Sequence, residues 1–281
     1  TLILSCAFLL SFGQQQTFQL AQSYQAEGNH AEAISNYKKA GLDFQLNDQT
    51  QQYAQCNILI ADCYVAMGRL QEANVQIKNT LDYIQEVLPQ EKTVLIDGLL
   101  IQGEVFLKLG RNDLCIEALH QAESIIGAGM TMQAATCYND LGVAYWNNQN
   151  KELALGYHLK AMQIRSKLMQ PNSVALADTY LNLGLVYLED DFLQAIIQFN
   201  KALEIYKRNF GTQHPQIALC YNNLAFANSN AGNYATALNY LDLTLNIWDS
   251  TFDGDHPNKA FTLSNKGRIY EQQGDYDQAL I

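Results

Sequence analysis

The chain has 281 residues, of which 48% are hydrophobic and 16% are charged, with only 4 prolines. This composition provides enough apolar material for a folded core and is unlike that of a disordered chain. The 28 acidic residues outnumber the 17 basic ones, the net charge is −11, and no basic run interrupts the excess. Nucleic acid and anionic lipid surfaces are therefore poor partners for this chain.

The chain opens on an apolar, uncharged stretch over residues 1–12, and polar residues follow from Gln14 on. Ser11 and Gly13 are small residues at the −3 and −1 positions of a cleavage site, and the stretch is shorter than the about 20 residues that span a bilayer. We therefore predict that residues 1–13 are a signal peptide. The signal is N-terminally incomplete, because neither a Met nor a basic segment precedes it. The mature chain is then exported and does not insert into a membrane.

Two alternatives are open for the same stretch. It could be a buried first helix of the fold. Cys6 could instead be the lipid-bearing cysteine of a lipoprotein, although Ala7 to Leu10 stay apolar where a mature lipoprotein usually turns polar.

A pattern of about 41 residues runs through the rest of the chain. GNYATAL and GDYDQAL, 42 residues apart, place a glycine, an aromatic residue and an alanine at the same offsets. Each copy also has a small residue after an apolar pair. These residues are Ala21, Ala61, Gly103, Gly142, Gly184, Ala225 and Gly267. A period this regular indicates an array of structural repeats.

Each copy is expected to be a pair of helices. Apolar residues recur three and four positions apart on either side of the small residue, which is the period of an amphipathic helix. A second small residue follows about twelve positions later in every copy. These residues are Ala33, Ala73, Cys115, Ala154, Ala195, Ala237 and Ala279. Most copies have a glycine between the two, where the chain can turn in the left-handed conformation. We predict that the small residues lie where the two helices cross.

These residues resemble the tetratricopeptide repeat, whose signature is matched by AMGRLQEA, EGNHAEAI, AGNYATAL and QGDYDQAL. The resemblance implies an all-α, right-handed superhelical solenoid of antiparallel helix pairs over residues 14–281, with six repeats and a truncated seventh. The copies are longer than is usual for the family. FGTQHP and FDGDHP look like the linkers of the roughly 42-residue variant found in kinesin light chains and many bacterial scaffolds.

The joints between copies differ from one another. Pro215 and Pro257 suit the first turn of a following helix, and Gly211 and Gly254 suit the end of a preceding one. The fifth copy, YLEDDFLQA, lacks the turn glycine and is one residue short, so we expect a tighter connection there. The linker at residues 124–132, SIIGAGMTM, is the most irregular. We expect a flexible point or a change of pitch at this linker.

Signals of catalysis and of metal binding are absent from the sequence pattern. The histidines are scattered, with no i, i+4 pair and no Cys-x-x-Cys partner, so no metal site is expected. They are His30, His120, His158, His214 and His256. The cysteines beyond residue 13 fit small buried apolar positions. Neither a phosphate loop nor a nucleophile elbow is present, and we predict that this chain is not an enzyme and holds no cofactor.

The resemblance implies that the first helices of successive copies line a concave groove. At one groove-facing position the last four copies carry an amide or a carboxylate. An Asn side chain both donates and accepts a hydrogen bond, so it can pair with a peptide unit of any sequence. The predicted peptide-binding residues are Asn139, Asp140, Trp146, Asn182, Leu185, Asn222, Asn223, Phe226 and Asn265. The alternative is that these amides only solvate the groove or cap neighbouring backbone.

We therefore predict a scaffold that binds a protein or peptide ligand, in an exported bacterial protein of the periplasm or the extracellular space. The basic residues of the carboxylate clamps in chaperone-binding repeats are missing, which disfavours a ligand held by its C-terminal carboxylate. One alternative is the regulatory region of an enzyme whose catalytic domain, a caspase-like CHAT protease or a sensor kinase, lies beyond residue 281. Another is a structural spacer. The seventh copy stops one turn into its second helix, so a capping helix is expected to follow.

Overall fold

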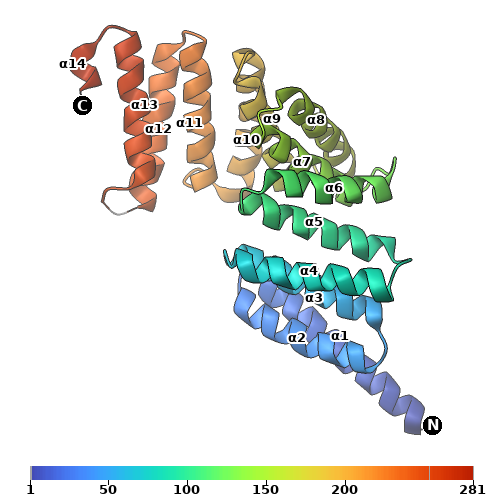
Figure 1. Ribbon diagram of the computed structural model, residues 1–281. Coiled ribbons are helices and arrows are strands. Elements are labelled where there is room, and N and C mark those ends of the chain that lie inside the picture. The colour runs from blue at the N-terminus through green and yellow to red at the C-terminus, as the bar shows by residue number, and fades with distance from the viewer. Residues whose placement is uncertain (1, 253, 281) are drawn as a thin grey trace. The chain divides into compact units, whose positions relative to one another are not determined.

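The computed structural model describes residues 2–252 and 254–280, with side chains from residue 13 onward. Among these residues there are fourteen helices and no strand. The chain divides into two compact units, Thr1–Asn148 and Gln149–Ile281. Within each unit, every helix packs antiparallel against the next one along the chain (Figure 1). The predicted all-α solenoid of helix pairs is confirmed.

Unit 1 contains three helix pairs and the first helix of a fourth. Its helices are α1 (Leu2–Ala26), α2 (His30–Leu46), α3 (Thr50–Ala66), α4 (Leu70–Val87), α5 (Lys92–Lys108), α6 (Asn112–Ile126) and α7 (Met132–Asn147). The signal peptide predicted for residues 1–13 falls almost wholly outside the residues whose side chains are described, and it stays a prediction. The division between the units lies at Gln149 and not in the irregular linker at 124–132.

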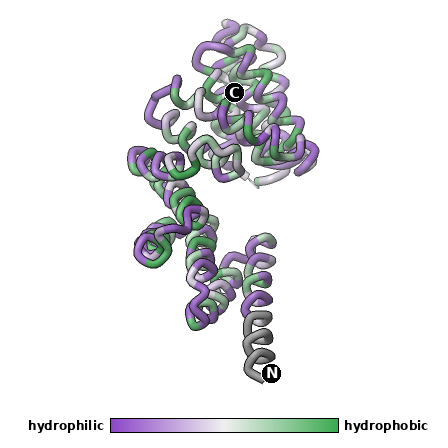
Figure 2. The backbone as a smooth tube through the Cα atoms, turned by 90° about the vertical axis from the view of Figure 1, so that its right-hand side faces the viewer, coloured by the Kyte–Doolittle hydropathy of each residue, from purple (hydrophilic) through white to green (hydrophobic). Residues whose placement is uncertain are grey.

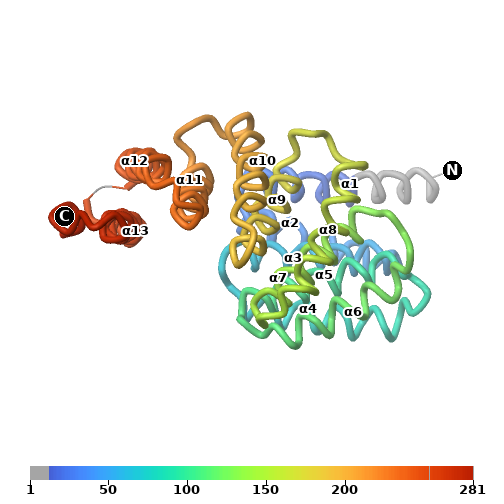
Figure 3. Tube along the Cα trace, turned by 90° about the horizontal axis from the view of Figure 1, so that it is seen from above, coloured from blue at the N-terminus to red at the C-terminus, as the bar shows by residue number. Residues whose placement is uncertain are grey.

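Unit 2 begins with the second helix of the fourth repeat. Its helices are α8 (Lys151–Leu168), α9 (Val174–Tyr187), α10 (Phe192–Phe210), α11 (Pro215–Asn230), α12 (Tyr234–Thr251), α13 (Pro257–Gln272) and α14 (Tyr276–Ala279). Figure 2 shows hydrophobic and hydrophilic residues alternating along the helices of both units, as expected of amphipathic helices. Figure 3 shows α11, α12 and α13 end-on, with α12 packed beside the other two.

The small residues lie where the two helices of a repeat cross, as predicted. A Cβ atom added to Gly103 on α5 would lie 2.6 Å from Cδ2 of Leu119 on α6. A Cβ atom added to Gly184 on α9 would lie 2.4 Å from Cε1 of Phe199 on α10. Real Cβ atoms do not approach carbon this closely, so a larger residue would have to displace the facing side chain or shift one of the two helices.

The residue that fills each crossing lies four positions after the second small residue, at what we call the knob position. Its side chain is at most 1% exposed in every one of the first six repeats. The knob residues are Tyr37, Ile77, Leu119, His158, Phe199 and Leu241. The sequence pattern did not reveal this position, because the residue type varies from repeat to repeat while its burial does not.

His158 is the exception among the knob residues. Its side chain is 1% exposed, and its Nδ1 atom is buried without a hydrogen-bond partner. Burial lowers the pKa of His158 to about 4, with the nearby Arg165 guanidinium as a smaller cause. The imidazole is therefore neutral at pH 7, and its unpaired nitrogen destabilises this repeat relative to one with an apolar knob.

The turns inside the repeats follow the predicted glycine rule, with one substitution. The glycines at this turn have φ between +70° and +81°; they are Gly28, Gly68, Gly110, Gly232 and Gly274. In the fourth repeat Gln149 takes the same place with φ +60°. In the fifth repeat the turn is shorter, as expected: the Asp191 N–H bonds to the Tyr187 carbonyl four residues back. In the sixth repeat the corresponding bond, from Asn233 to Asn228, reaches five residues back.

The two His-Pro joints are built alike. Pro215 and Pro257 begin α11 and α13, as predicted. The histidine before each proline caps the helix: Nδ1 of His214 accepts from the N–H of Gln216, and Nδ1 of His256 from that of Asn258, both at 3.2 Å. These bonds satisfy amides that no carbonyl of the helix can reach.

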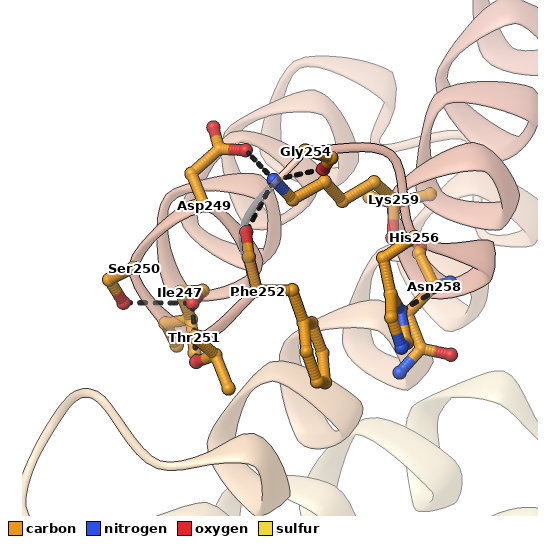
Figure 4. Close-up of polar contacts among 10 residues, drawn as sticks. Ile247, Asp249, Ser250, Thr251, Phe252, Gly254, His256, Asn258 and Lys259 are labelled. Atoms are coloured by element: carbon orange, nitrogen blue, oxygen red, sulfur yellow. Dashed lines mark hydrogen bonds and ion pairs between the residues drawn. The ribbon is translucent and has the colours of Figure 1, made fainter.

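Each capping histidine also ends a column of stacked rings. In the second joint, Phe252 stacks on Trp248 with centroids 5.5 Å apart. Phe252 also stacks on His256, with centroids 3.6 Å apart (Figure 4). Lys259 of α13 closes this joint, since its Nζ donates to the carbonyls of Phe252 and Gly254 and lies 2.9 Å from Oδ1 of Asp249. A cation at the C-terminus of α12 also complements the helix dipole.

We expect His158→Leu to raise the free energy of unfolding by about 1 to 2 kcal/mol at pH 7.5, because Leu fills the same crossing in two other repeats without an unpaired nitrogen. The gain should be larger at pH 5. There the histidine of the unfolded chain, with a pKa of about 6.5, is protonated, while the folded one still is not. Urea titration at both pH values measures this. Leu241→His is the reverse control, and a loss of stability in His158→Leu would contradict this interpretation.

The two contributions of His256 to the stability of the second joint, the helix cap and the ring stack, can be measured separately. His256→Asn keeps a capping side chain and loses the ring, whereas His256→Phe keeps the ring and loses the cap. We expect each to cost about 1 kcal/mol, and His256→Ala to cost about 2 kcal/mol because it loses both. Chemical denaturation compares the three variants. If His256→Phe is as unstable as His256→Ala, the stack contributes nothing.

Candidate peptide-binding face

Some first helices of neighbouring repeats are in contact, namely α3 with α5, α5 with α7 and α11 with α13. We call the surface that the first helices of a unit present the first-helix face. It is built from α1, α3, α5 and α7 in unit 1, and from α9, α11 and α13 in unit 2. Side-chain hydrogen bonds connect neighbouring first helices. They run from Gln25 to Asp62 at 2.7 Å, from Gln133 to Asp97 at 2.5 Å and from Asn265 to Asn222 at 3.1 Å.

The residue directly after the first small residue of each repeat differs in charge and polarity from one repeat to the next. In unit 1 it is acidic in the second and third repeats, with Asp62 on α3 and Glu104 on α5, and uncharged in the other two, with Gln22 on α1 and Val143 on α7. Burial raises the pKa of both carboxyls. For Glu104, Lys108 at 3.6 Å opposes this rise, and the charge of Asp62 adds to it. The hydrogen bond from Gln25 opposes the rise in the pKa of Asp62.

In unit 2 the same position is apolar and then basic, with Leu185 on α9, Phe226 on α11 and Arg268 on α13. The guanidinium carbon of Arg268 lies 5.2 Å from the centroid of the Phe226 ring. One of its terminal nitrogens donates to Oδ1 of Asn265 at 3.2 Å, and Nδ2 of Asn265 donates in turn to Oδ1 of Asn222. Four side chains from two helices thus form one connected cluster.

Three of the residues predicted to bind a ligand lie on α7 in unit 1. Nδ2 of Asn139 donates to Oδ1 of Asp140 at 3.1 Å. Trp146 is half-buried near the end of the helix. Both polar side chains therefore have partners within the fold.

The other six predicted residues lie in unit 2. Asn182 and Leu185 are half-buried on α9, where Leu185 packs against the apolar core. Asn222 and Asn265 are brought together from α11 and α13 by their hydrogen bond. Asn223 is half-buried, and its amide has no hydrogen-bond partner among the residues that the structure describes.

Three residues of the first-helix face escaped the sequence analysis: Asp62, Glu104 and Arg268. The available signal was their common place directly after the small residue, because a position that lines one face in one repeat does so in all of them. Of the residues at this position, only Leu185 and Phe226 were recognised as candidate ligand contacts.

The described residues offer no cluster of three or more His, Cys, Asp or Glu side chains suited to a metal ion. None of their helices has both the length and the apolar character needed to cross a membrane. The cysteines described are free and buried, as predicted, and burial raises the pKa of each thiol to about 12. They are Cys56, Cys63, Cys115, Cys137 and Cys220.

The pairing of helices around a small residue, with a glycine turn between them, defines a helix-pair repeat protein. Models of the tetratricopeptide repeat match residues 133–208, 176–241 and 216–281, and a further one matches residues 18–40. Together they cover more than half of the chain. The chain belongs to the tetratricopeptide repeat family, whose members bind protein or peptide partners and whose fold is typically non-catalytic.

Solved structures of low sequence identity share the fold. BtubC (BKLC) from P. vanneervenii is 21% identical, with a TM-score of 0.66 over 87% of this chain and 94% of that chain. A Rap protein complexed with competence and sporulation factor is 15% identical, with a TM-score of 0.65 over 96% of this chain and 74% of that chain.

Curated relatives correct the predicted localisation. The chain is 24% identical over 193 residues to the clustered mitochondria protein homolog of Aspergillus clavatus, a match that covers 66% of this chain and 15% of that protein. Proteins of the same name from other fungi match equally well. The chain spans about 15% of the length of the curated relatives that it matches. The prediction of an exported bacterial protein is wrong, because these relatives are fungal and are named for clustered mitochondria.

The acidic side chains of unit 1 lead to a pH-dependent expectation. Because its pKa is raised in the folded chain, Glu104 favours folding below its ordinary pKa, and this contribution is lost as the pH rises through the raised value. Glu104→Gln should therefore raise the free energy of unfolding at pH 7.5, and the gain should vanish in mild acid, where Glu104 itself is protonated. The lost pair with Lys108 counts for little, because the Lys108 side chain is itself exposed to solvent.

Urea titrations of Glu104→Gln at the two pH values check this. Glu117→Gln, which changes an exposed glutamate of α6, is the matched control and should show no such difference. A gain of equal size at both pH values would show that the charge of Glu104 is not its cause.

Proposed function

We propose that residues 14–281 act as a scaffold that binds an extended segment of a partner protein on the first-helix face of unit 2. The observation that carries this proposal is the row of amides on neighbouring first helices, at Asn222, Asn223 and Asn265. Among them Asn223 keeps both a donor and an acceptor unpaired in the described fold. A half-buried amide without a partner is suited to a peptide unit of a ligand.

The spacing of the helices supports an extended ligand. Neighbouring helices pack about 8 to 10 Å apart, and an extended chain advances about 3.3 Å per residue. Each first helix would therefore meet about every third residue of the ligand. Hydrogen bonds to its backbone would give affinity, and the half-buried Leu185 would contact a side chain.

The comparisons add support from the fold. A Rap protein complexed with competence and sporulation factor has the same fold over 96% of this chain, so a solenoid of this kind can hold a partner. The alternative of a regulatory region whose catalytic domain lies beyond residue 281 is untested and stays an alternative.

The amide row is tested with a library of random twelve-residue peptides displayed on phage and selected on the immobilised chain. Selected peptides, made synthetically, are titrated by calorimetry into the chain and into Asn223→Ala. We expect the substitution to weaken binding by about 0.5 to 1.5 kcal/mol, because it removes one hydrogen bond to the ligand backbone.

Asn200→Ala, which removes an exposed amide from the second helix α10, serves as the control and should leave the affinity unchanged. Thermal melting of both variants should match that of the parent. If Asn223→Ala binds as tightly as the parent, Asn223 takes no part in binding. If no peptide is enriched at all, the scaffold proposal fails.

A further inference from the structure

Among the described residues, Arg268 is the one cation of α13 without a carboxylate partner. The helix carries two others, and both are paired: Nζ of Lys266 bonds to Oδ1 of Asp242 at 2.6 Å, and Nζ of Lys259 lies 2.9 Å from Oδ1 of Asp249. Arg268 has no carboxylate partner among the described residues, and its side chain is exposed. The chain has a net charge of −11. An arginine that pairs with none of the described carboxylates is therefore available to a carboxylate of a ligand.

We propose that Arg268 binds the carboxylate of an aspartate or glutamate within the ligand segment. This inference rests on the proposed function, and it specifies the chemistry of one ligand residue. A guanidinium offers five N–H donors in a planar fork that matches a carboxylate. Only one of these donors has a partner in the described fold, namely Oδ1 of Asn265.

The surroundings of Arg268 hold its fork in place before any ligand arrives. The ring of Phe226 on α11 lies beneath the guanidinium, at 5.2 Å from its carbon to the ring centroid. Asn265 fixes one edge of the fork and is itself held by Asn222. Because the Arg268 side chain is already ordered, binding of a ligand there costs less conformational entropy than binding that must first order a mobile arginine.

The charge of the chain restricts the partner further. An acidic run would meet the excess negative charge of the protein, whereas one acidic residue opposite Arg268 would meet a local positive charge. Leu185 and Phe226, at the same position of the two preceding repeats, carry no charge. The expected segment therefore has a single acidic residue in an otherwise uncharged stretch.

The test repeats the phage selection in parallel on the parent chain, on Arg268→Gln and on Arg111→Gln. Arg111 is an exposed arginine of unit 1, so the last variant has the same change of charge away from this face. The displayed peptides are joined to the phage through their C-termini and have no free terminal carboxylate. We expect Asp or Glu to be enriched at one position on the parent and on Arg111→Gln, but not on Arg268→Gln.

A selected peptide, acetylated and amidated at its ends, is then compared with its Glu→Gln version by calorimetry. On the parent chain the Gln version should bind roughly 3 to 10 times more weakly, as expected for the loss of a bidentate charged pair at an exposed site. On Arg268→Gln the two peptides should differ by less than about twofold, because the partner of the carboxylate is gone.

Two results would overturn the inference while leaving the scaffold standing. One is equal binding of the Glu and Gln peptides to the parent. The other is a peptide that has no acidic residue and binds through its free C-terminus in a manner that depends on Arg268. That result would show that the arginine binds a terminal carboxylate. If no peptide is enriched on the parent, the scaffold proposal and this inference fall together. Unchanged melting of Arg268→Gln excludes unfolding as the cause of lost binding.

Discussion

The close crossing of two helices at one small residue is the contact on which the rest of the structure depends. Where Gly184 meets the ring of Phe199, no Cβ atom fits, so the two backbones approach each other and the knob is fully buried. The same approach in each pair sets the angle of the first helix to its neighbours. The first-helix face exists because this one contact is repeated, and a ligand residue would meet each repeat at the same register.

Much of the fold was readable from the sequence, because its strongest constraints are steric and local. A glycine turn, a proline at the start of a helix and a small residue at a crossing each demand one or two residue types, so they recur visibly. The knob position was not visible, since Tyr37, Ile77 and His158 satisfy the same requirement for volume with different chemistry. Gln149, which adopts the glycine conformation in the fourth repeat, shows that even the turn rule tolerates one strained residue.

The candidate site was less predictable, because its chemistry depends on which side chains meet across helices. The amide positions could be named from their register, but the pairing of Asn265 with Asn222 could not, since it depends on the offset between α11 and α13. Arg268 was passed over for a similar reason: its role follows from the Phe226 ring beneath it, 42 residues earlier in the chain. The prediction of localisation was wrong for a different reason: an apolar N-terminal stretch can be something other than an export signal.

The ring column at the second His-Pro joint has an optical consequence. The chain contains 2 tryptophans, and each unit has one: Trp146 on α7 in unit 1 and Trp248 on α12 in unit 2. Trp248 is 3% exposed and stacked on Phe252, whereas Trp146 is half-buried. Their indoles therefore sit in environments of different polarity. Replacing either one by phenylalanine would leave a chain whose intrinsic fluorescence reports on a single unit, so that the unfolding of the two halves could be followed separately without an added dye.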